Sequence, residues 1–506
     1  MVTRSKAGVF KPKALVVDKS ESEPVSVEEA LAYPDWCLAV HAEYDPLIVN
    51  STWELRPLLP GRKAIGCKWL FKVKTNLDGS IARRKARLVA KGFSQVPGCD
   101  FKETFSPVVK PATIRTILSI AVTNSWSLRQ VDVNNAFLNG DLTDEVFMQQ
   151  PPGFVQSGPS GEKLVCCLKK ALYGLRVSPE FTLYVLVYVD DIVITGNSSD
   201  EINCFVQQLH NEFALKDMGE LHYFLGIEVS RTSSGGLHLS QHKYIRELLD
   251  RGHMSNVKSV HTPMVSSSML SKDEGELLAD PTEYRSLAGA LQYIVLTRPD
   301  IAYAVNRVCQ FMHAPTTSHM VALKRILRYL RGTLSHGLVF RRSNRLSLVG
   351  YAYANWGLDF DDRRSTTGYC VYFGHTPVSR CSKKQSVVSC STAEAEYRSL
   401  AVATSDITWL VSLLAELHVK SVDLPTVWCD NSSVVAVAAN SVLHSKFKHV
   451  ELDLFFVREK VASGDLVVGE VPACDQVADV LTKPLSVSLF SRFRNFLRVV
   501  PLEEAG

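Results

Sequence analysis

The sequence predicts an α+β protein with several domains. Residues 53–107 alternate apolar and polar side chains as strands do, and residues 283–331 place their apolar side chains at helical spacing. Residues 346–484 follow the pattern strand–strand–helix–strand–helix. At about 150 residues per domain, the 506 residues allow two to four domains. Hydrophobic residues make up 46% and charged residues 21%, which excludes a wholly disordered chain.

The sequence gives no sign of membrane insertion or secretion. The longest apolar candidate, residues 183–189, runs directly into Asp190 and Asp191 and falls short of the roughly 20 residues of a membrane helix. The first residues, MVTRSKAGVFKPK, contain no apolar core of a secretion signal. The 12 cysteines are scattered and form no CxxC pair, which favours reduced thiols. We therefore expect an intracellular protein without membrane association.

The first half is predicted to be a lead-in followed by strands. Residues 26–50 form a short helical lead-in that Pro34 interrupts. The runs WLFKVKT and ARRKARLVAKGF alternate apolar and basic side chains around an NLDGS turn, which predicts a β-hairpin. Residues 112–124 have helical spacing, LYVLVYV and IVITG are two apolar strands joined by Asp190 and Asp191, and residues 201–213 form an amphipathic helix.

The second half is predicted to begin with a linker and three helices. Residues 255–280 are polar and rich in serine, which is typical of a linker. The helices follow over residues 283–296, 299–311 and 319–331, and the final 20 or so residues are predicted to form a surface helix. We place domain boundaries near residues 50, 255 and 345.

The net charge of +4 is unevenly distributed. Residues 61–110 contain 12 Lys or Arg and three acids, a net charge of +9. Residues 301–350 contain eight Lys or Arg and no acid, so the other 406 residues sum to −13. Two basic blocks in an otherwise acidic chain predict a groove for a polyanion. Two solvated faces are the alternative.

Acidic side chains interrupt the apolar strands at two places. Asp190 and Asp191 form a turn that can present two carboxylates to a divalent metal, since buried neighbouring carboxylates need a cation to compensate them. Asp132 ends the strand QVDV and can supply a third carboxylate from a neighbouring strand. Three such carboxylates suit two-metal phosphoryl transfer. An exposed Asp-Asp turn without a ligand is the alternative.

Motifs in a fixed order run through residues 50–490. The first half contains KWLFKVKTNLDGSIARRKARLVAKGFSQ, QVDVNNAFLNGDL, LKKALYGLR, LVYVDDIVITG and LGIEV. The second half contains TRPDIAYAVN, KKQSVVSCSTAEAEYRSLA, WCDN and DQVADVLTKPL. Together they resemble the reverse transcriptase and ribonuclease H (RNase H) of copia-type LTR retrotransposons, in the C-terminal part of the Pol polyprotein.

The resemblance implies a fold, an activity and partners. It implies three domains: an antiparallel fingers and palm region over residues 51–254, a helical thumb or connection over 255–345, and an RNase H-like α/β domain with a mixed sheet over 346–485. A lead-in (1–50) precedes these domains, and a C-terminal tail (486–506) follows them. The implied activities are RNA-directed DNA polymerisation and RNA cleavage in RNA–DNA hybrids, with Mg²⁺ or Mn²⁺ as cofactor. The implied partners are an RNA template, a DNA primer, a hybrid and dNTPs, in the cytoplasm (as a virus-like particle) or the nucleus; a dimer is left open.

The resemblance also assigns roles to single residues. The implied metal ligands are Asp132, Asp190 and Asp191 for polymerisation, and Glu396, Asp430 and Asp475 for RNA cleavage, with Glu394 as a substitute for Glu396. Phe137 is the implied gate against a ribose 2′-OH, Tyr173 and Gly174 back the template base and nucleotide, and Lys85, Arg87 and Lys91 meet phosphates. The alternatives are a core aromatic for Phe137, and helix caps or a solvated helix face for the last three acids.

Two departures from the family pattern predict impaired activity. Between Pro179 and Tyr188 the chain lacks the several tens of residues that hold the palm helix. One face of the strand over 183–188 should therefore be exposed to water. That face carries either Leu183, Val185 and Val187 or the residues that alternate with them.

The second departure is in the run YAYANW, where Tyr353 replaces the first RNase H ligand and Asn355 replaces a second aspartate. A neutral phenol is a poor Mg²⁺ ligand. We expect an impaired enzyme, with a catalytically dead nucleic-acid-binding remnant as the alternative; a gene-model artefact is a third explanation of the gap.

Overall fold

The computed structural model describes residues 23–49, 51–58, 64–75, 81–90, 109–133, 141–158, 163–170, 183–188, 191–212, 215–265, 270–440 and 448–505. The chain forms two compact units. The first comprises Met1–Pro107, Val133–Ser178 and Asn211–Leu215, and the second comprises Val108–Asp132, Pro179–His210 and Lys216–Gly506. The predicted boundaries near residues 50, 255 and 345 do not coincide with this division and stay predictions.

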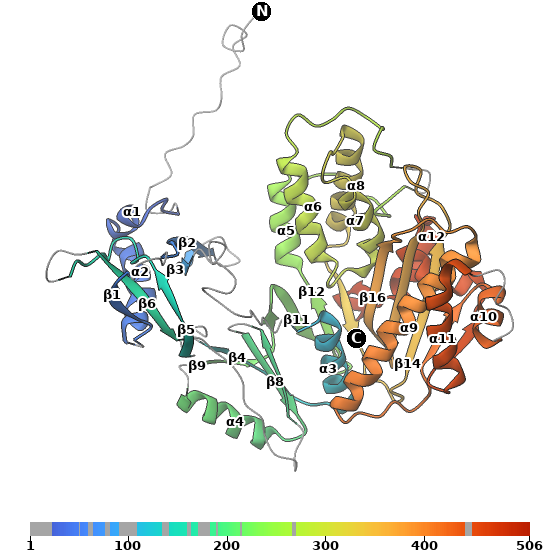
Figure 1. The fold of residues 1–506 in the computed structure, drawn as a ribbon, viewed down its shortest axis with the longest axis horizontal. Helices are drawn as coiled ribbons and strands as arrows, with labels where there is room; N and C mark the ends of the chain where they lie inside the picture. Colours follow the sequence, from blue (N-terminus) through green and yellow to red (C-terminus); the bar gives the residue numbers. More distant parts are fainter. Residues whose placement is uncertain are drawn as a thin grey trace, which may run out of the picture. The chain divides into compact units, whose positions relative to one another are not determined.

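The first unit packs two helices against a β-hairpin (Figure 1). Its elements are α1 (Val27–Leu31), α2 (Pro34–Val49), β2 (Cys67–Thr75) and β3 (Ile81–Ala90). Pro34 begins α2, where its missing N–H is not needed by the helix. Trp36 and Val40 of α2 pack with Trp69 and Ala86 of the hairpin, so the alternating pattern places one face of the hairpin in a core. A separate antiparallel sheet has the order β1-β6-β5 (Trp53–Pro57, Leu164–Lys170 and Asp141–Met148).

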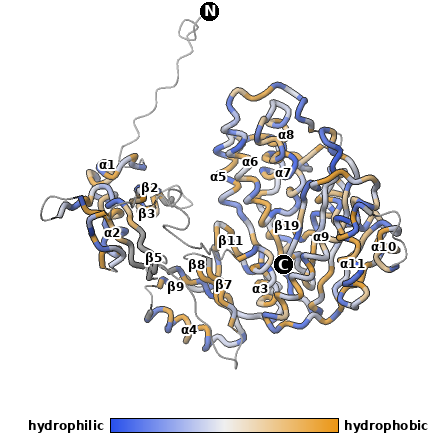
Figure 2. The backbone as a smooth tube through the Cα atoms, viewed as in Figure 1, coloured by the Kyte–Doolittle hydropathy of each residue, from blue (hydrophilic) through white to orange (hydrophobic). Residues whose placement is uncertain are grey.

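The second unit contains a four-stranded sheet in the order β7-β8-β4-β9. Its strands are β4 (Leu128–Val133), β7 (Leu183–Tyr188), β8 (Asp191–Gly196) and β9 (Leu215–Glu220), and the helices α3 (Pro111–Asn124) and α4 (Ser199–Glu212) adjoin it in sequence. Figure 2 shows the apolar character of β7 and β8. On β7, Tyr184 and Leu186 are buried in the core, whereas Val185 is 36% exposed. Leu183 and Val187 are half-buried. The face that was predicted to lose its cover is therefore partly exposed to water.

A five-stranded antiparallel sheet lies at the centre of the second unit, in the order β10-β11-β12-β13-β19. Its strands are β10 (Tyr223–Phe224), β11 (Ile227–Arg231), β12 (Leu237–Ser240), β13 (His336–Phe340) and β19 (Val499–Pro501). Leu225 and Gly226 both have positive φ, at 50° and 69°, as a two-residue type I′ hairpin loop requires. The predicted C-terminal surface helix is confirmed as α12 (Val487–Phe496), which buries only Phe490 and Phe493 and is followed by β19.

Four helices of the second unit pack against one another: α5 (His242–Arg251), α6 (Thr282–Ile294), α7 (Ala302–Cys309) and α8 (Thr317–Gly332). The last three confirm the helices predicted over residues 283–331. A buried ion pair stabilises the join between α6 and α7: Arg298 donates to both carboxylate oxygens of Asp300 at 3.0 and 2.8 Å. The Tyr329 hydroxyl donates to the same carboxylate at 2.6 Å, so no charge in this network lacks a partner.

The last sheet is mixed and five-stranded, in the order β16-β15-β14-β17-β18. The strands are β14 (Leu348–Asn355), β15 (Thr366–Phe373), β16 (Thr376–Lys384), β17 (Thr426–Cys429) and β18 (Val467–Glu470), and the helices are α9 (Thr392–Glu416), α10 (Ser432–Ala439) and α11 (Glu451–Ala462). β14, β15 and β16 are antiparallel, and β17 and β18 are parallel to β14. This arrangement confirms the predicted α+β class and the mixed sheet.

One helix in the described part of the chain, α9, is long and apolar enough to cross a membrane by length and composition alone. This is weak evidence, since the core helix of a globular protein passes the same test. α9 packs against β14 and β15, and Tyr397, Leu400 and Ile407 on it are buried. These contacts are those of a core helix.

Candidate active sites and nucleic-acid interface

Two of the three predicted polymerase ligands lie opposite each other on neighbouring strands of the sheet β7-β8-β4-β9. Asp132 on β4 is directly opposite Asp191 on β8 in the antiparallel register. Opposite residues have Cβ atoms about 4.5–5.5 Å apart, so the two carboxylates share one face. Gln130, two residues before Asp132, donates to Asp191 Oδ1 at 3.4 Å and to the Tyr223 carbonyl at 2.8 Å. The strand register therefore brings these acids together, as the sequence predicted.

Several predicted site residues lie outside the described residues. These are Lys91, Phe137, Tyr173, Gly174 and Asp190. Their assigned roles stay predictions.

The hairpin of β2 and β3 has one apolar and one basic face. Phe71, Ala86 and Trp69 face α2, while the alternate positions Lys72, Lys85 and Arg87 point to the other face. Lys72 is directly opposite Lys85. Like charges at opposite positions destabilise a hairpin unless an anion compensates them. Lys68, Lys72, Arg83, Lys85 and Arg87 therefore form a candidate nucleic-acid surface, which we call the basic hairpin face.

Acids are present at two points next to the basic hairpin face. Lys72 forms an exposed ion pair with Glu23 at 3.7 Å. The charges of Arg87 and Lys85 lower the pKa of Glu43, although burial raises it overall. These contacts offset part of the basic charge without reversing its sign.

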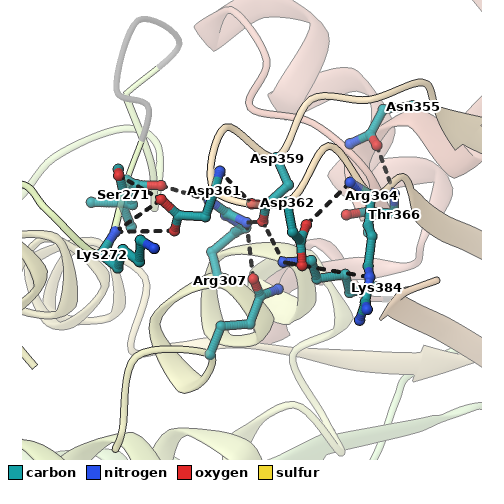
Figure 3. Close-up of polar contacts among 12 residues, drawn as sticks. Ser271, Lys272, Arg307, Asn355, Asp359, Asp361, Asp362, Arg364, Thr366 and Lys384 are labelled. Carbon is teal, nitrogen blue, oxygen red and sulfur yellow. Dashed lines mark hydrogen bonds and ion pairs between the residues drawn. The ribbon is translucent and has the colours of Figure 1, made fainter. Parts of the chain in front are cut away.

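Several arginines of the second basic block, residues 301–350, make contacts within the protein. Arg307 forms a buried ion pair with Asp359 and donates to the Leu270 carbonyl at 2.8 Å. Figure 3 shows Arg307 beside Asp359, with Lys384 bridging Asp359 and Asp362 at 2.8 Å to each. Arg328 and Arg331 donate to the carbonyls of Lys258 and Ser255. Arg307 is therefore used inside the protein, and Arg328 and Arg331 hold the preceding segment in place while remaining partly exposed. Polyanion binding by this block stays a prediction.

An acidic cluster lies at the end of the mixed sheet. It consists of Glu396 on α9, Asp430 directly after β17, and Asp479 in the short helix η7 (Val477–Leu481). Burial raises the pKa of Glu396 to about 7, and the charges of Asp430 and Asp479 add to this shift. Burial also raises the pKa values of Asp430 and Asp479. The three carboxyls are therefore close enough to repel one another.

A lysine and a tyrosine complete the acidic cluster. The Lys483 ammonium lies 2.8 Å from Asp479 Oδ2 and 3.5 Å from the Tyr353 hydroxyl. It also lies over the Tyr353 ring, 4.5 Å from its centroid. Its charge lowers the pKa values of Glu396, Asp430 and Asp479, opposing the effect of burial. Burial raises the pKa of Tyr353, so its phenol stays neutral at pH 7.

The structure corrects one member of the predicted ligand set. Asp475 ends the short helix η6 (Ala473–Asp475) and forms a half-exposed ion pair with Arg492. Asp479, four residues later, lies beside Glu396 and Asp430 instead. The sequence feature that indicates Asp479 is the run VADVL, in which this single acid stands among apolar residues and is therefore expected to be buried. An acid that is buried at a cost is the stronger candidate for a site.

Two neighbouring polar residues have structural roles. Asn355 is buried, accepts the Thr366 N–H at 2.7 Å and donates to the Thr482 carbonyl. Glu394 accepts the Cys390 N–H at 2.7 Å and pairs with Arg398 at 2.9 Å, so it fixes the start of α9. The position of Glu394 favours Glu396 as the site residue.

The cluster offers oxygen atoms but does not suit two metal ions. Glu396 Oε2, Asp430 Oδ1 and Asp479 Oδ1 are buried and have no hydrogen-bond partner. Such oxygens suit a hard divalent cation. However, no three His, Cys, Asp or Glu side chains in the described part of the chain are grouped closely enough to hold a metal ion. Tyr353 and Lys483 contribute a phenol and an ammonium where further carboxylates are needed.

Comparisons with known proteins decide the family. A family model described as Reverse transcriptase (RNA-dependent DNA polymerase) matches residues 50–182 and 178–266. The Retrovirus-related Pol polyprotein from transposon RE1 of Arabidopsis thaliana is 48% identical over 99% of this chain. The Putative transposon Ty5-1 protein of Saccharomyces cerevisiae is 30% identical, and this chain covers 97% of its length. The chain belongs to the copia-type retrotransposon Pol family. Divalent metal use is general in this family.

The match to Pol polyproteins is partial in two respects. The TNT 1-94 polyprotein of Nicotiana tabacum is 37% identical over 92% of this chain. The chain spans only about a third of each polyprotein, 36% of RE1 and 38% of TNT 1-94. The RE1 alignment runs over 535 positions against 506 residues here, so at least 29 of its positions have no counterpart. The two segments matched by the family model meet at residues 178–182, where the sequence predicts the missing palm segment.

Solved structures show more distant likenesses. The foamy viral protease-reverse transcriptase in complex with an RNA/DNA hybrid aligns with 93% of this chain and 66% of its own, at 12% identity and a TM-score of 0.42. LC11-RNase H1, isolated from compost, aligns with 27% of this chain and 92% of its own, at 16% identity and a TM-score of 0.22.

Proposed function

We propose that this chain is the reverse transcriptase and RNase H part of a retrotransposon Pol polyprotein, with both activities impaired. The observation that carries the polymerase proposal is the pair Asp132 and Asp191, opposite each other on β4 and β8. Carboxylates at this position suit Mg²⁺, which when bound would lower the pKa of a primer 3′-OH and neutralise the leaving pyrophosphate. The substrates would be an RNA template, a DNA primer and dNTPs.

The impairment of polymerisation is proposed from the missing segment after Pro179. A crossover between strands takes a dozen or more residues, and the chain has only three, 180–182, before β7 begins. The partly exposed face of β7 is consistent with a lost covering helix.

Primer extension on a poly(rA) template tests this proposal. The chain as it stands should extend an oligo(dT) primer barely above background. Insertion of a family-like helical segment after Pro179 should restore extension, and Asp191→Asn in the restored chain should remove it. Robust extension without the insertion would contradict the impairment.

A second candidate function is nucleic-acid binding without turnover. The phenol of Tyr353 and the ammonium of Lys483 in the acidic cluster favour it, as does the basic hairpin face. The chain with the inserted segment distinguishes the impaired polymerase from the binding remnant: failure to extend the primer, with hybrid binding intact, would favour the binding remnant.

We also propose that the protein is located in the cytoplasm or nucleus. The 11 described cysteines are free thiols, which supports this proposal.

A further inference from the structure

An apolar cavity of about 390 Å³ lies in the second unit. Its walls come from α3, β7, β8, the β10–β11 hairpin, β12 and α6, and include Leu118, Leu186, Val193, Phe224, Val229 and Leu239. Neither Asp132 nor Asp191 lines it. This volume is within the range of small-molecule sites. The walls are apolar enough to hold a hydrocarbon body.

One charged group breaks the apolar lining. Arg115 of α3 is 8% exposed and lines the cavity beside Leu296. Its guanidinium donates to the carbonyls of Leu296 and Val378 at 3.1 and 3.3 Å. Among the described residues it forms no ion pair. A neutral carbonyl leaves the charge of a buried guanidinium uncompensated.

A second guanidinium converges on the same point. Arg380 of β16 donates to the Leu296 carbonyl at 2.7 Å and to the Val295 carbonyl. Its Nη1 is buried and has no hydrogen-bond partner. The acid that acts on Arg380 is Asp300, whose carboxylate already accepts from Arg298 and Tyr329. The buried Arg115 and the partly buried Arg380 therefore share one carbonyl, and the charge of Arg115 makes it harder for Arg380 to stay charged.

The pKa values of Arg115 and Arg380 are both lowered, which reflects the cost of keeping two positive charges away from water. Burial lowers the pKa of Arg115 to about 10. Burial, and then the charge of Arg115, lower the pKa of Arg380 well below its usual range. A negative charge at the cavity wall would offset this cost, and the planar fork of a guanidinium matches a carboxylate.

We propose that this cavity binds an amphipathic monocarboxylate, whose hydrocarbon body fills the apolar walls and whose carboxylate pairs with Arg115. This site is independent of the proposed polymerase and RNase H activities. A medium-chain fatty acid has this chemistry, and decanoate is a suitable probe.

Calorimetric titration of the full chain with decanoate tests the proposal. Decanoate should bind saturably at one site, and decanol, which has the same body without the charge, should bind roughly tenfold more weakly because it loses the charge-assisted hydrogen bonds. Arg115→Met should remove the preference for decanoate over decanol. Leu118→Trp, which fills the cavity, should weaken both ligands.

A matched variant controls for general charge effects. Arg56 is an exposed arginine paired with Glu54 at 2.6 Å, and Arg56→Met should leave the decanoate affinity unchanged. If Arg115→Met does not fold, the Leu118→Trp and decanol results decide. Equal affinities for decanoate and decanol, non-saturable binding, or full binding by Leu118→Trp would overturn the proposal.

Discussion

The acids of the β4–β8 pair and those of the acidic cluster are positioned by different means. Asp132 and Asp191 meet because the backbone register of two strands places them opposite each other. The cluster draws Tyr353, Glu396, Asp430 and Asp479 from four separate elements. The register of β4 and β8 is kept although the segment after Pro179 is missing. In the acidic cluster the fold is kept as well, but one substitution, Tyr353 in place of an acid, changes the set of side chains. The first site therefore needs a segment for repair, and the second needs one side chain.

The largest expected effect is a gain of function at the acidic cluster. Tyr353→Asp should raise Mg²⁺-dependent cleavage of the RNA strand in an RNA–DNA hybrid by about 10³-fold, because a carboxylate replaces the neutral phenol at the shared ligand position. The full chain is the suitable protein, since the mixed sheet shares its core with the rest of the second unit. Cleavage is followed on a labelled hybrid.

The repair should not include Asn355→Asp. Asn355 donates to the Thr482 carbonyl, and a carboxylate there would face that oxygen without a proton. Asp430→Asn in the repaired chain is the control and should return cleavage to the starting level. If the unrepaired chain already cleaves hybrid at a rate that Asp430→Asn abolishes, the role given to Tyr353 is wrong.

The next effect concerns binding at the basic hairpin face. Lys85→Glu with Arg87→Glu should weaken hybrid binding by on the order of 10–100-fold at low salt and lower the slope of log affinity against log salt by about two, since two phosphate contacts are lost. Adding Lys91→Glu tests the third predicted contact. Fluorescence anisotropy at several salt concentrations gives the slope, and an unchanged slope would exclude this face from the interface.

A smaller effect is expected in the pH dependence of stability. The pKa of Glu396 is raised from 4.5 to about 7 in the folded chain, so folding becomes less favourable as the pH rises through this window, and the penalty is complete above pH 7. Glu396→Gln should remove a penalty on the order of 3 kcal/mol, which is a rise of roughly 4 °C in Tm at pH 8 for a unit of this size, and change little at pH 4.5. Differential scanning calorimetry at both pH values measures this.

Glu394→Gln is the matched control on the same helix. It removes the ion pair with Arg398 and weakens the contact with the Cys390 N–H, so it should lower the Tm at pH 8 rather than raise it. A rise in Tm with both variants would mean that helix propensity, not the cluster, explains the result.

The smallest effect is expected in the second basic block. Arg328→Gln removes a hydrogen bond to the Lys258 carbonyl and should cost about 1 kcal/mol of stability. It should leave the salt dependence of hybrid binding unchanged, because this arginine is engaged within the protein. A reduced slope would return residues 301–350 to the nucleic-acid interface.

Local patterns predicted much of the fold. The alternation in residues 67–90 and the turn between its two runs predicted the β2–β3 hairpin, and the apolar strands around Asp190 and Asp191 predicted the β7–β8 pair. Asp132 was correctly placed on a strand next to the Asp190–Asp191 turn, because acids that interrupt apolar strands stand at strand ends. These features depend on neighbours in sequence or on one strand pairing.

Features that depend on distant contacts were missed. Asp475 and Asp479 are four residues apart, and only the packing of η7 against β14 and β15 decides which of them meets Glu396. Lys483 became part of the cluster for the same reason. The arginines of residues 301–350 look like a surface block, but their partners include backbone carbonyls of residues 255–270, which no charge count reveals.

The pairing of β19 with β13 sets an order for folding during synthesis. The central sheet joins strands that begin at Tyr223 to a strand that ends at Pro501, so the polypeptide must be made as far as residue 501 before the sheet can close. Until then the edge of β13, with Leu338 and Val339 otherwise buried, is unpaired. Such long-range closure is slow, and an unpaired strand edge is a site at which the nascent chain can associate with other chains.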